Sequence, residues 1–168
     1  MNAVKRAAFA TLALFLALSS SHSAYASTNH QTQGIVHWVI DGDTFQLETG
    51  ERIRLIGINT PEYLPWKHRA DFYGKEAYHY SKNLLTNKEI HLEKDVVEKD
   101  KYGRTLAYAY LGTGEFVNLL LVREGYAKAR SYPPNTRYHK MLKNAEREAR
   151  ALQKGLWNRK AKAVPKAA

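Results

Sequence analysis

Alternating apolar and polar residues predict a series of short β-strands. The turn dipeptide Asp41-Gly42 separates the first two strands. The third follows Thr49-Gly50 and ends at Thr60-Pro61, because proline cannot donate to a strand ladder. The first three strands therefore form an antiparallel meander. The predicted strands are residues 34–40, 44–47, 52–58, 89–94 and 105–111.

Apolar residues at a spacing of 3–4 positions predict three helices. The first covers residues 74–87, and the second covers 116–124 and stops at Gly125, which suits a left-handed cap. The predicted inner face of the first helix consists of Ala77, Tyr80, Ser81, Leu84 and Leu85. The third follows Pro133-Pro134-Asn135 and ends at Gly155. Its apolar positions at helical spacing are Met141, Leu142, Ala145, Ala149 and Leu152.

This order of elements, β-β-β-α-β-β-α-α, predicts an α+β fold. A small closed barrel of five strands, of the oligonucleotide/oligosaccharide-binding (OB) type, fits the strand number. The three helices would pack against it. An antiparallel α+β sandwich is the structural alternative.

The first 26 residues have the three-part layout of a secretory signal peptide. Lys5 and Arg6 precede the apolar run Ala7–Leu18, and small residues lead up to Ala26. A retained membrane anchor is the alternative, but the run is shorter than the roughly 20 residues that span a bilayer. We therefore expect export, either secreted or periplasmic, with no membrane span after cleavage.

The remaining chain divides by composition. Residues 27–33 are polar and are predicted to be disordered, residues 34–158 form the folded domain, and residues 159–168 form a flexible basic tail. The domain has a size suited to a single core. There is no cysteine, so packing or a bound ion must stabilise it.

The chain is strongly basic, with a net charge of +10 that falls only by the two charges of Lys5 and Arg6 on signal cleavage. Such an excess favours a polyanionic partner: nucleic acid, an anionic cell surface or an acidic polymer. Charge alone does not choose among them.

Three segments carry residues that could perform chemistry. In Asp41-Gly42-Asp43-Thr44, the Asp-Gly pair could simply form a hairpin turn, or Asp43 could present its carboxylate to a divalent cation. Arg54 lies between apolar neighbours, so an enclosed guanidinium would need an anion, either a phosphate or a structural partner. The candidate structural partners are Glu48, Glu51 and Glu62.

Glu62 follows a proline that stiffens its loop, and could polarise a water molecule or only cap the backbone. The third segment, residues 100–104, is a turn that either is simply solvated or presents Arg104 to a ligand. Together the segments supply oxygen ligands, a base and two guanidinium groups. Phosphodiester hydrolysis needs this combination.

The chain resembles the thermonuclease (staphylococcal nuclease) family over nearly all of residues 34–157. DGDT alone is weak evidence, but the motifs in this order are specific. They are residues 40–44 (IDGDT), 54–62 (RLIGINTPE), 100–108 (DKYGRTLAY), 117–125 (VNLLLVREG) and 155–157 (GLW).

The resemblance implies a barrel with three helices, one Ca²⁺ ion, and cleavage of DNA and RNA to products with 3′-phosphates. Separately from the resemblance, we expect single strands to be preferred and the protein to be a monomer, since nothing in the sequence suggests an interface larger than ordinary surface. The residues divide by role as follows: Asp43, Asn59 and the Thr60 carbonyl would hold the metal; Glu62 would hold the attacking water; Arg54 and Arg104 would bind the phosphate; Lys101, Tyr102 and Tyr132 would contact terminal phosphate and base.

Two positions depart from the family pattern. Asn59 is an amide where a carboxylate is usual, so we expect weaker calcium binding without loss of activity. The loop of residues 128–135 is shorter and offers Tyr132 but no second tyrosine, and Arg130 could substitute as a stacking plane.

Two other functions remain open from the sequence. A barrel of this kind can bind nucleic acid without cutting it, although such a module has no need for Asp43, Glu62, Arg54 and Arg104 together. The lysine-rich tail also fits a basic protein that coats an anionic surface.

Overall fold

The computed structural model describes residues 31–158. The predicted signal peptide and basic tail therefore lie outside the described residues. Within the described range, no helix is both long enough and apolar enough to cross a membrane.

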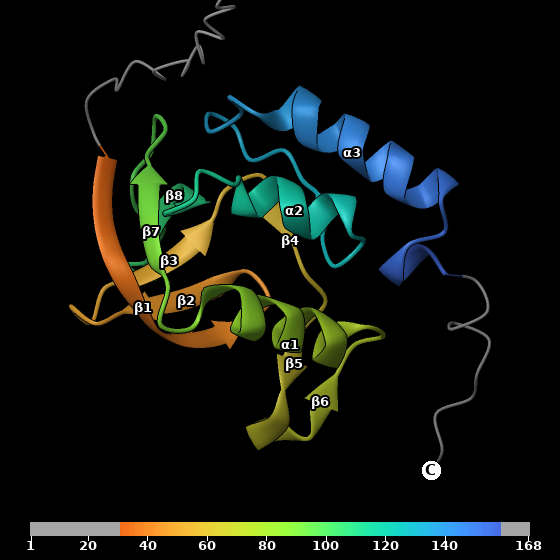
Figure 1. Ribbon diagram of the computed structural model, residues 1–168, viewed down its shortest axis with the longest axis horizontal. Coiled ribbons are helices and arrows are strands. Elements are labelled where there is room, and N and C mark those ends of the chain that lie inside the picture. Colours follow the sequence, from red (N-terminus) through yellow and green to blue (C-terminus); the bar gives the residue numbers. More distant parts are fainter. Residues whose placement is uncertain (1–30, 159–168) are drawn as a thin grey trace, which may run out of the picture.

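Five strands close into a barrel in the order β1-β2-β3-β8-β7 (Figure 1). The predicted α+β barrel is therefore confirmed. The strands are β1 (Gln31–Asp41), β2 (Thr44–Leu47), β3 (Arg52–Leu55), β7 (Glu89–Glu93) and β8 (Thr105–Leu111).

The pairing of the strands confirms the antiparallel meander of β1, β2 and β3. β7 pairs antiparallel with both β1 and β8. The barrel closes through a parallel pairing of β3 with β8, in which Arg54 lies opposite Leu106. This closure brings the end of β3 and the start of β8 to one edge of the barrel.

Two strand boundaries differ from the prediction. β1 starts at Gln31, so residues 31–33, which were predicted to be disordered, pair with β7 instead. Main-chain hydrogen bonds suffice for this pairing, which is why polar composition gave no sign of it. β3 ends at Leu55, because Gly57 adopts a positive φ of 79° and turns the chain into β4 (Ile58–Asn59).

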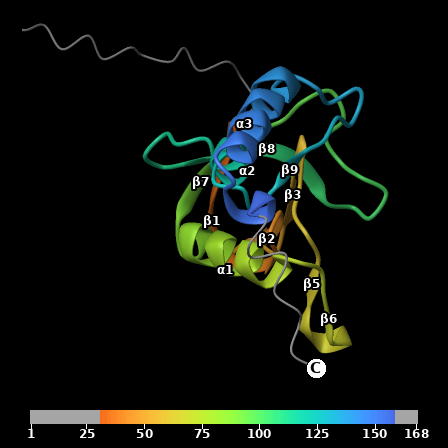
Figure 2. The same ribbon diagram turned by 90° about the vertical axis from the view of Figure 1, so that its right-hand side faces the viewer.

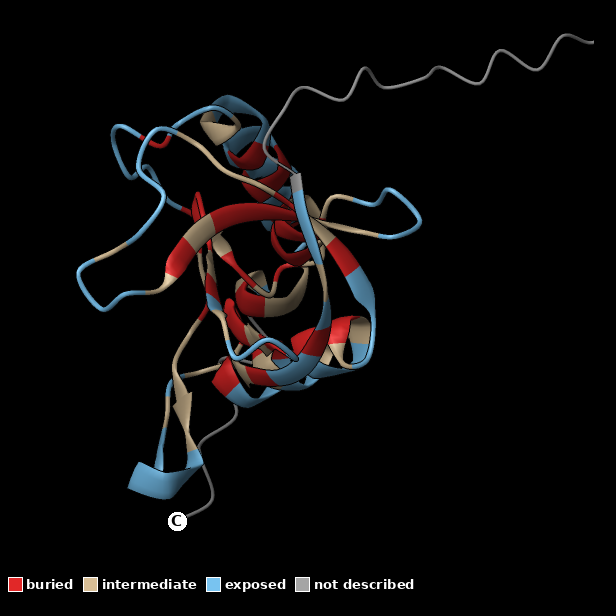
Figure 3. Cartoon of the chain, turned by 90° about the vertical axis from the view of Figure 1, so that its left-hand side faces the viewer, coloured by how far each residue is buried: buried red, intermediate tan, exposed pale blue. Residues whose placement is uncertain are grey.

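The barrel interior is formed by buried residues (Figure 3), and its core is apolar. β4 pairs with β9 (Lys128–Ala129) outside the barrel, so that Asn59 lies opposite Lys128. The core residues contributed by the barrel strands are Val36, Val39, Phe45, Leu47, Ile53, Leu55, Ile90, Leu92, Ala107 and Ala109.

Three α-helices lie among the described residues, namely α1 (Gly74–Leu85), α2 (Val117–Arg123) and α3 (His139–Ala151). α1 packs against β1, whereas α2 lies between β8 and α3 (Figure 1). The predicted inner face of α1 is confirmed, since Ala77, Ser81 and Leu85 are buried. In α3 the ends of the apolar pattern, Met141 and Leu152, are exposed instead.

A small hairpin projects from the body of the protein below α1 (Figure 2). It consists of β5 (Tyr63–Leu64), the 3-10 turn η1 (Pro65–Lys67) and β6 (Arg69–Ala70). We call residues 63–70 the finger. It was not predicted, because its strands are too short to show an alternating pattern.

Glu146 is a charged residue in the buried face of α3, with 2% of its surface exposed. Lys143 Nζ lies 2.6 Å from one of its carboxylate oxygens, and Arg150 Nη2 lies 2.7 Å from the other. The Arg150 guanidinium in turn lies 3.7 Å from the centre of the Trp157 ring, in the 3-10 turn η2 (Gly155–Trp157). Glu146 therefore ties α3 to the C-terminal turn.

We expect the Glu146→Gln substitution to lower the free energy of unfolding at neutral pH by about 1–3 kcal/mol, because it weakens two charge-assisted hydrogen bonds. Burial opposes ionisation of Glu146, but Lys143 and Arg150 outweigh it and lower the pKa of its carboxyl. A lowered carboxyl pKa stabilises the fold above the unfolded pKa of about 4.3, and this stability is lost as pH falls through the folded pKa. Urea unfolding from neutral to acidic pH measures both effects. If Glu146→Gln has the same free energy of unfolding as the wild type at neutral pH, and loses it equally steeply in acid, this role of Glu146 is contradicted.

Candidate active site

The turn between β1 and β2 is held from several sides. The Asp43 amide donates to Asp41 Oδ1 at 2.9 Å. The Ser81 hydroxyl of α1 donates to the Gly42 carbonyl at 2.6 Å. A Cβ atom on Gly42 would lie 2.7 Å from the Thr60 side chain, so only glycine allows this close approach. The Asp-Gly pair therefore does more than reverse the chain, because it places Asp43 against Thr60.

The Asp43 carboxylate is almost fully enclosed, with 5% of the residue exposed. Its Oδ2 accepts the Thr60 amide at 2.9 Å and lies 3.0 Å from Arg54 Nη2. Burial raises the pKa of the Asp43 carboxyl above its ordinary value, and the Arg54 guanidinium and Thr60 amide only partly offset it. The charged form is therefore costly here, and a further positive charge beside it would stabilise it.

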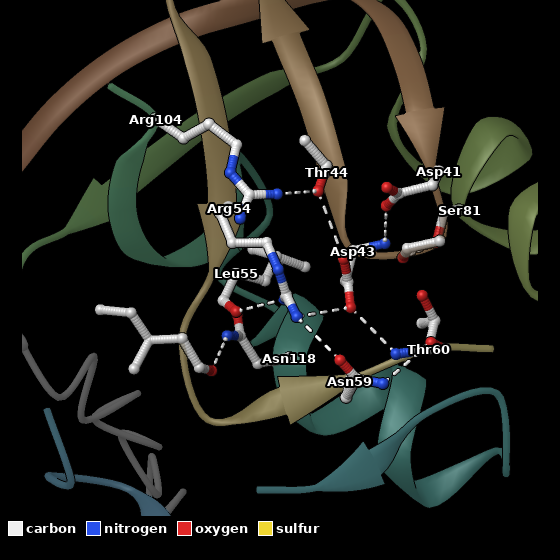
Figure 4. A network of polar contacts seen from close by, with 12 residues as sticks. Asp41, Asp43, Thr44, Arg54, Leu55, Asn59, Thr60, Ser81, Arg104 and Asn118 are labelled. Atoms are coloured by element: carbon white, nitrogen blue, oxygen red, sulfur yellow. Dashed lines mark hydrogen bonds and ion pairs between the residues drawn. The ribbon is translucent and has the colours of Figure 1, made fainter. Parts of the chain in front are cut away.

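Arg54 bridges two oxygen atoms of the site (Figure 4). Its Nη2 lies within hydrogen-bond distance of both Asp43 Oδ2 and Asn59 Oδ1, the latter at 3.2 Å. Its Nη1 donates to the Leu55 carbonyl at 2.8 Å. The sequence offered three glutamates as structural partners of Arg54. That prediction is wrong, because the anion that pairs with Arg54 is Asp43.

Arg104, the residue before β8, reaches the Asp43 carboxylate only through Thr44. Its Nε donates to Asp100 Oδ2 at 2.7 Å, and its Nη1 donates to Thr44 Oγ1 at 3.4 Å. The Thr44 hydroxyl donates to Asp43 Oδ1 at 3.3 Å. The two guanidinium groups are thus connected through one carboxylate and one hydroxyl (Figure 4).

Glu62 sits where the chain leaves the site for the finger. Its amide donates to Asp71 Oδ2 at 3.2 Å, and its carbonyl accepts the Asp71 amide at 2.8 Å. Burial raises the pKa of the Glu62 carboxyl, and the negative charges of Asp41 and Asp71 raise it further. Arg54 and Arg69 act in the opposite direction. Glu62 therefore shares the electrostatic environment of Asp41 and Arg54.

The donors around Asp43 suit a hard cation. Asp43 Oδ2 and Asn59 Oδ1 already converge on one cationic atom of Arg54, and the Thr60 carbonyl lies beside Asn59. In the described range, no group of three or more His, Cys, Asp or Glu side chains could hold an ion by itself. A metal here would therefore need amide and carbonyl oxygens and water, which is calcium chemistry and not that of zinc.

Asn59 is oriented by both ends of its amide. Oδ1 accepts from Arg54, whereas Nδ2 donates to the Thr60 carbonyl at 3.1 Å. A carboxylate at position 59 could not make the second bond. The amide therefore removes a negative charge and also engages a carbonyl that could serve as a ligand.

Of the three predicted substrate contacts, two lie beside Arg104. The Tyr102 ring is 63% exposed, with Lys101 Nζ 5.1 Å and the Arg104 guanidinium 5.5 Å from its centre. Tyr132 is exposed on a separate loop, where it pairs with Asn135, and it does not join the Asp43 network. Asn135 bonds both main-chain groups of Val97 and so holds this loop against the connection between β7 and β8.

Several residues of the site could not be found from the sequence. Asp41, Thr44 and Asp100 lie inside the motifs, but only their contacts reveal that they orient Asp43 and Arg104. Lys128, which the sequence did not indicate, lines a pocket of about 300 Å³ together with Asn59, Thr60 and Arg130, the last of which the sequence indicated as a possible stacking plane. Lys128 and Arg130 reach it because β9 pairs with β4, a pairing that has no signal in such short strands.

Comparison with known proteins finds related sequences over most of the chain. A family model described as "Staphylococcal nuclease homologue" matches residues 52–159. The thermonuclease of Staphylococcus intermedius is 44% identical over 128 residues, which cover 74% of this chain and 76% of that protein. The thermonuclease of Staphylococcus hyicus is 40% identical over 136 residues, or 79% of each chain. The SPbeta prophage-derived endonuclease YokF of Bacillus subtilis is 34% identical over 71% of this chain, but over only 42% of its own length.

Gly74 packs directly against the Glu62 backbone, since a Cβ atom there would lie 2.2 Å from the Glu62 carbonyl oxygen. We expect Gly74→Ala to lower the free energy of unfolding by about 1–3 kcal/mol, because two backbone segments would have to separate. Gly112→Ala is the matched control, since its nearest neighbour would be 3.7 Å away. Urea unfolding of both variants measures the difference. Equal stability of the two would show that the Glu62 loop is not held in this way.

Proposed function

Because the chain belongs to the family of staphylococcal nuclease homologues and is a hydrolytic nuclease, we propose that it is an exported, Ca²⁺-dependent enzyme that cleaves DNA and RNA. The products would carry 3′-phosphates, and single strands would be cut in preference to duplexes. The enzyme would act as a monomer, outside the cell or in the periplasm.

One observation supports the proposal more than any other. Arg54 lies on β3 and Arg104 immediately before β8, yet they reach neighbouring residues. Arg54 pairs with Asp43, whereas Arg104, which is held by Asp100, also donates to Thr44. Two guanidinium groups held this way, with a base nearby, suit a phosphodiester whose equatorial oxygens gain charge in the transition state. A barrel that only binds strands does not need a buried carboxylate between two arginines.

The residues would divide the reaction as follows. Arg54 and Arg104 would donate hydrogen bonds to the phosphate oxygens, and Glu62 would accept a proton from the attacking water. The raised pKa of Glu62 makes it a stronger base than a fully solvated glutamate. Water would form the new bond to phosphorus, and the bond to the 5′ oxygen would break, with that oxygen taking up a proton from solvent to leave as a hydroxyl.

Calcium would be held by the Asp43 carboxylate, the Asn59 amide oxygen and the Thr60 carbonyl. Bound there, the ion would act as a Lewis acid on the phosphate and lower the pKa of a coordinated water. Lys101 and Tyr102, next to Arg104, would contact a terminal phosphate. Tyr132 would contact a base.

Cleavage of single-stranded DNA should occur in calcium and stop in EDTA. We expect Glu62→Gln and Arg104→Gln each to lower kcat by about 10²–10³, the usual effect of losing one transition-state contact. Glu124→Gln and Arg123→Gln are the matched controls, since these residues pair with each other and with Lys154 outside the site. Gel electrophoresis follows the cleavage, and a chemical test of the 3′ ends shows whether the products carry a phosphate there.

DNA that stays intact in calcium contradicts the enzymatic function and favours a binding-only barrel. If DNA is cut but both site variants match their controls, the protein is a nuclease whose site lies elsewhere. Adsorption to anionic surfaces without any hydrolysis would instead support a coating protein.

The Asn59→Asp substitution should tighten calcium binding, because it restores a negative charge and frees the Thr60 carbonyl from its bond to Nδ2. We expect the calcium concentration for half-maximal activity to fall by about tenfold, with kcat changed much less. Calcium titration of activity, and of intrinsic fluorescence without substrate, measures this change. An unchanged calcium requirement would contradict the role given to Asn59.

A further inference from the structure

The tip of the finger presents an aromatic ring to solvent. Trp66 is 60% exposed in the η1 turn, although tryptophan is usually well buried. The neighbouring side chains Lys67, His68 and Arg69 are exposed too. The finger stands away from the barrel, so that its tip does not cover any core residue (Figures 2 and 3).

The base of the finger is fixed to the candidate active site. Glu62 and Asp71, which flank it, exchange two hydrogen bonds of 3.2 Å and 2.8 Å. Tyr63 packs on Tyr78 of α1, with ring centres 5.3 Å apart. The position of Trp66 is therefore tied to the backbone of Glu62.

An exposed ring beside cations is the usual platform for single-stranded nucleic acid. Bases stack on the ring, and the cations follow the backbone phosphates. The net charge of +10 has the sign that attracts such a strand. The cations of the finger are Lys67 and Arg69. Arg69 lies 3.9 Å from the exposed carboxylate of Asp71, but both cations are exposed and so remain accessible to a strand.

We propose that Trp66 stacks on a base of the substrate strand beyond the cleaved phosphate, while Lys67 and Arg69 contact its backbone. The finger would thus be a second substrate-binding surface that selects single strands of sufficient length. This inference rests on the proposed nuclease function. Trp66 is four residues from Glu62, or at most about 14 Å of extended chain, which spans roughly four nucleotides of a stacked strand.

The test compares Trp66→Ala with wild type on oligothymidylates of two to about sixteen nucleotides. We expect KM of the longest substrate to rise roughly 5- to 100-fold with kcat little changed, the usual effect of losing one base stack. The KM ratio of variant to wild type should approach one as the substrate shortens. Trp66→Phe should restore most of the loss.

Trp38→Ala is the matched control, since Trp38 is 52% exposed on β1 and the proposal gives it no contact with substrate. KM values that do not differ between Trp66→Ala and wild type at any length would overturn the proposal. So would an equal rise at all lengths that phenylalanine does not correct, because that pattern indicates a structural role.

Binding is measured separately, by the fluorescence anisotropy of a dye-labelled oligothymidylate in EDTA. If wild type cuts DNA but Trp66→Ala binds it equally well, only the role of the finger fails. If wild type does not cut, yet Trp66→Ala loses binding, the nuclease function fails and the finger remains a strand-binding surface. A Trp66-dependent response to anionic vesicles but not to oligonucleotide would make the finger a membrane contact and overturn the proposal.

Discussion

The structure depends on one buried carboxylate. Asp43 lies at the junction of β1 and β2, where almost no water reaches it. A charge in such a place must be paired and hydrogen-bonded, or it becomes protonated. The Thr60 amide and the Arg54 guanidinium meet part of this requirement, and Thr44 adds a weaker bond. A cation bound by the same oxygens would meet the remainder, and for this reason we propose Asp43 as the residue that anchors a metal ion.

The closed barrel allows this arrangement because of how its strands meet. β3 lies between β2 and β8, so arginines from β3 and from the start of β8 reach the same turn. Gly42 and Ser81 hold that turn against Thr60 and α1. The site therefore rests on rigid strands on one side and on the loop of Glu62 on the other. Rigidity would suit the proposed phosphate-binding role of the arginines, whereas the loop carries Glu62, the proposed base, and leads directly into the finger.

Much of the fold follows from local patterns. Turn dipeptides and alternation predicted the strands of the barrel, and 3.6-residue periodicity predicted the buried face of α1, because each of these signals is carried by neighbouring residues. The pairing of residues 31–33 with β7, the short β4–β9 ladder and the finger depend on partners far away in the chain. Contacts between residues far apart in the chain were likewise not predictable at the site. The motifs indicated Asp43, Arg54 and Arg104. The contacts of Arg54 with Asp43 and of Arg104 with Thr44, and the pairing of Lys128 with Asn59, exist only in three dimensions.

The most direct measurement is calorimetric titration of calcium into the wild-type protein and into Asp43→Asn, without substrate. Asparagine keeps the shape of the side chain and removes only its charge. If Asp43 anchors the ion, the wild type should bind a single calcium with measurable heat, and the variant should show no binding in the same range. Calcium binding that is equally tight in Asp43→Asn would contradict the account, because the buried carboxylate could then not be the metal anchor.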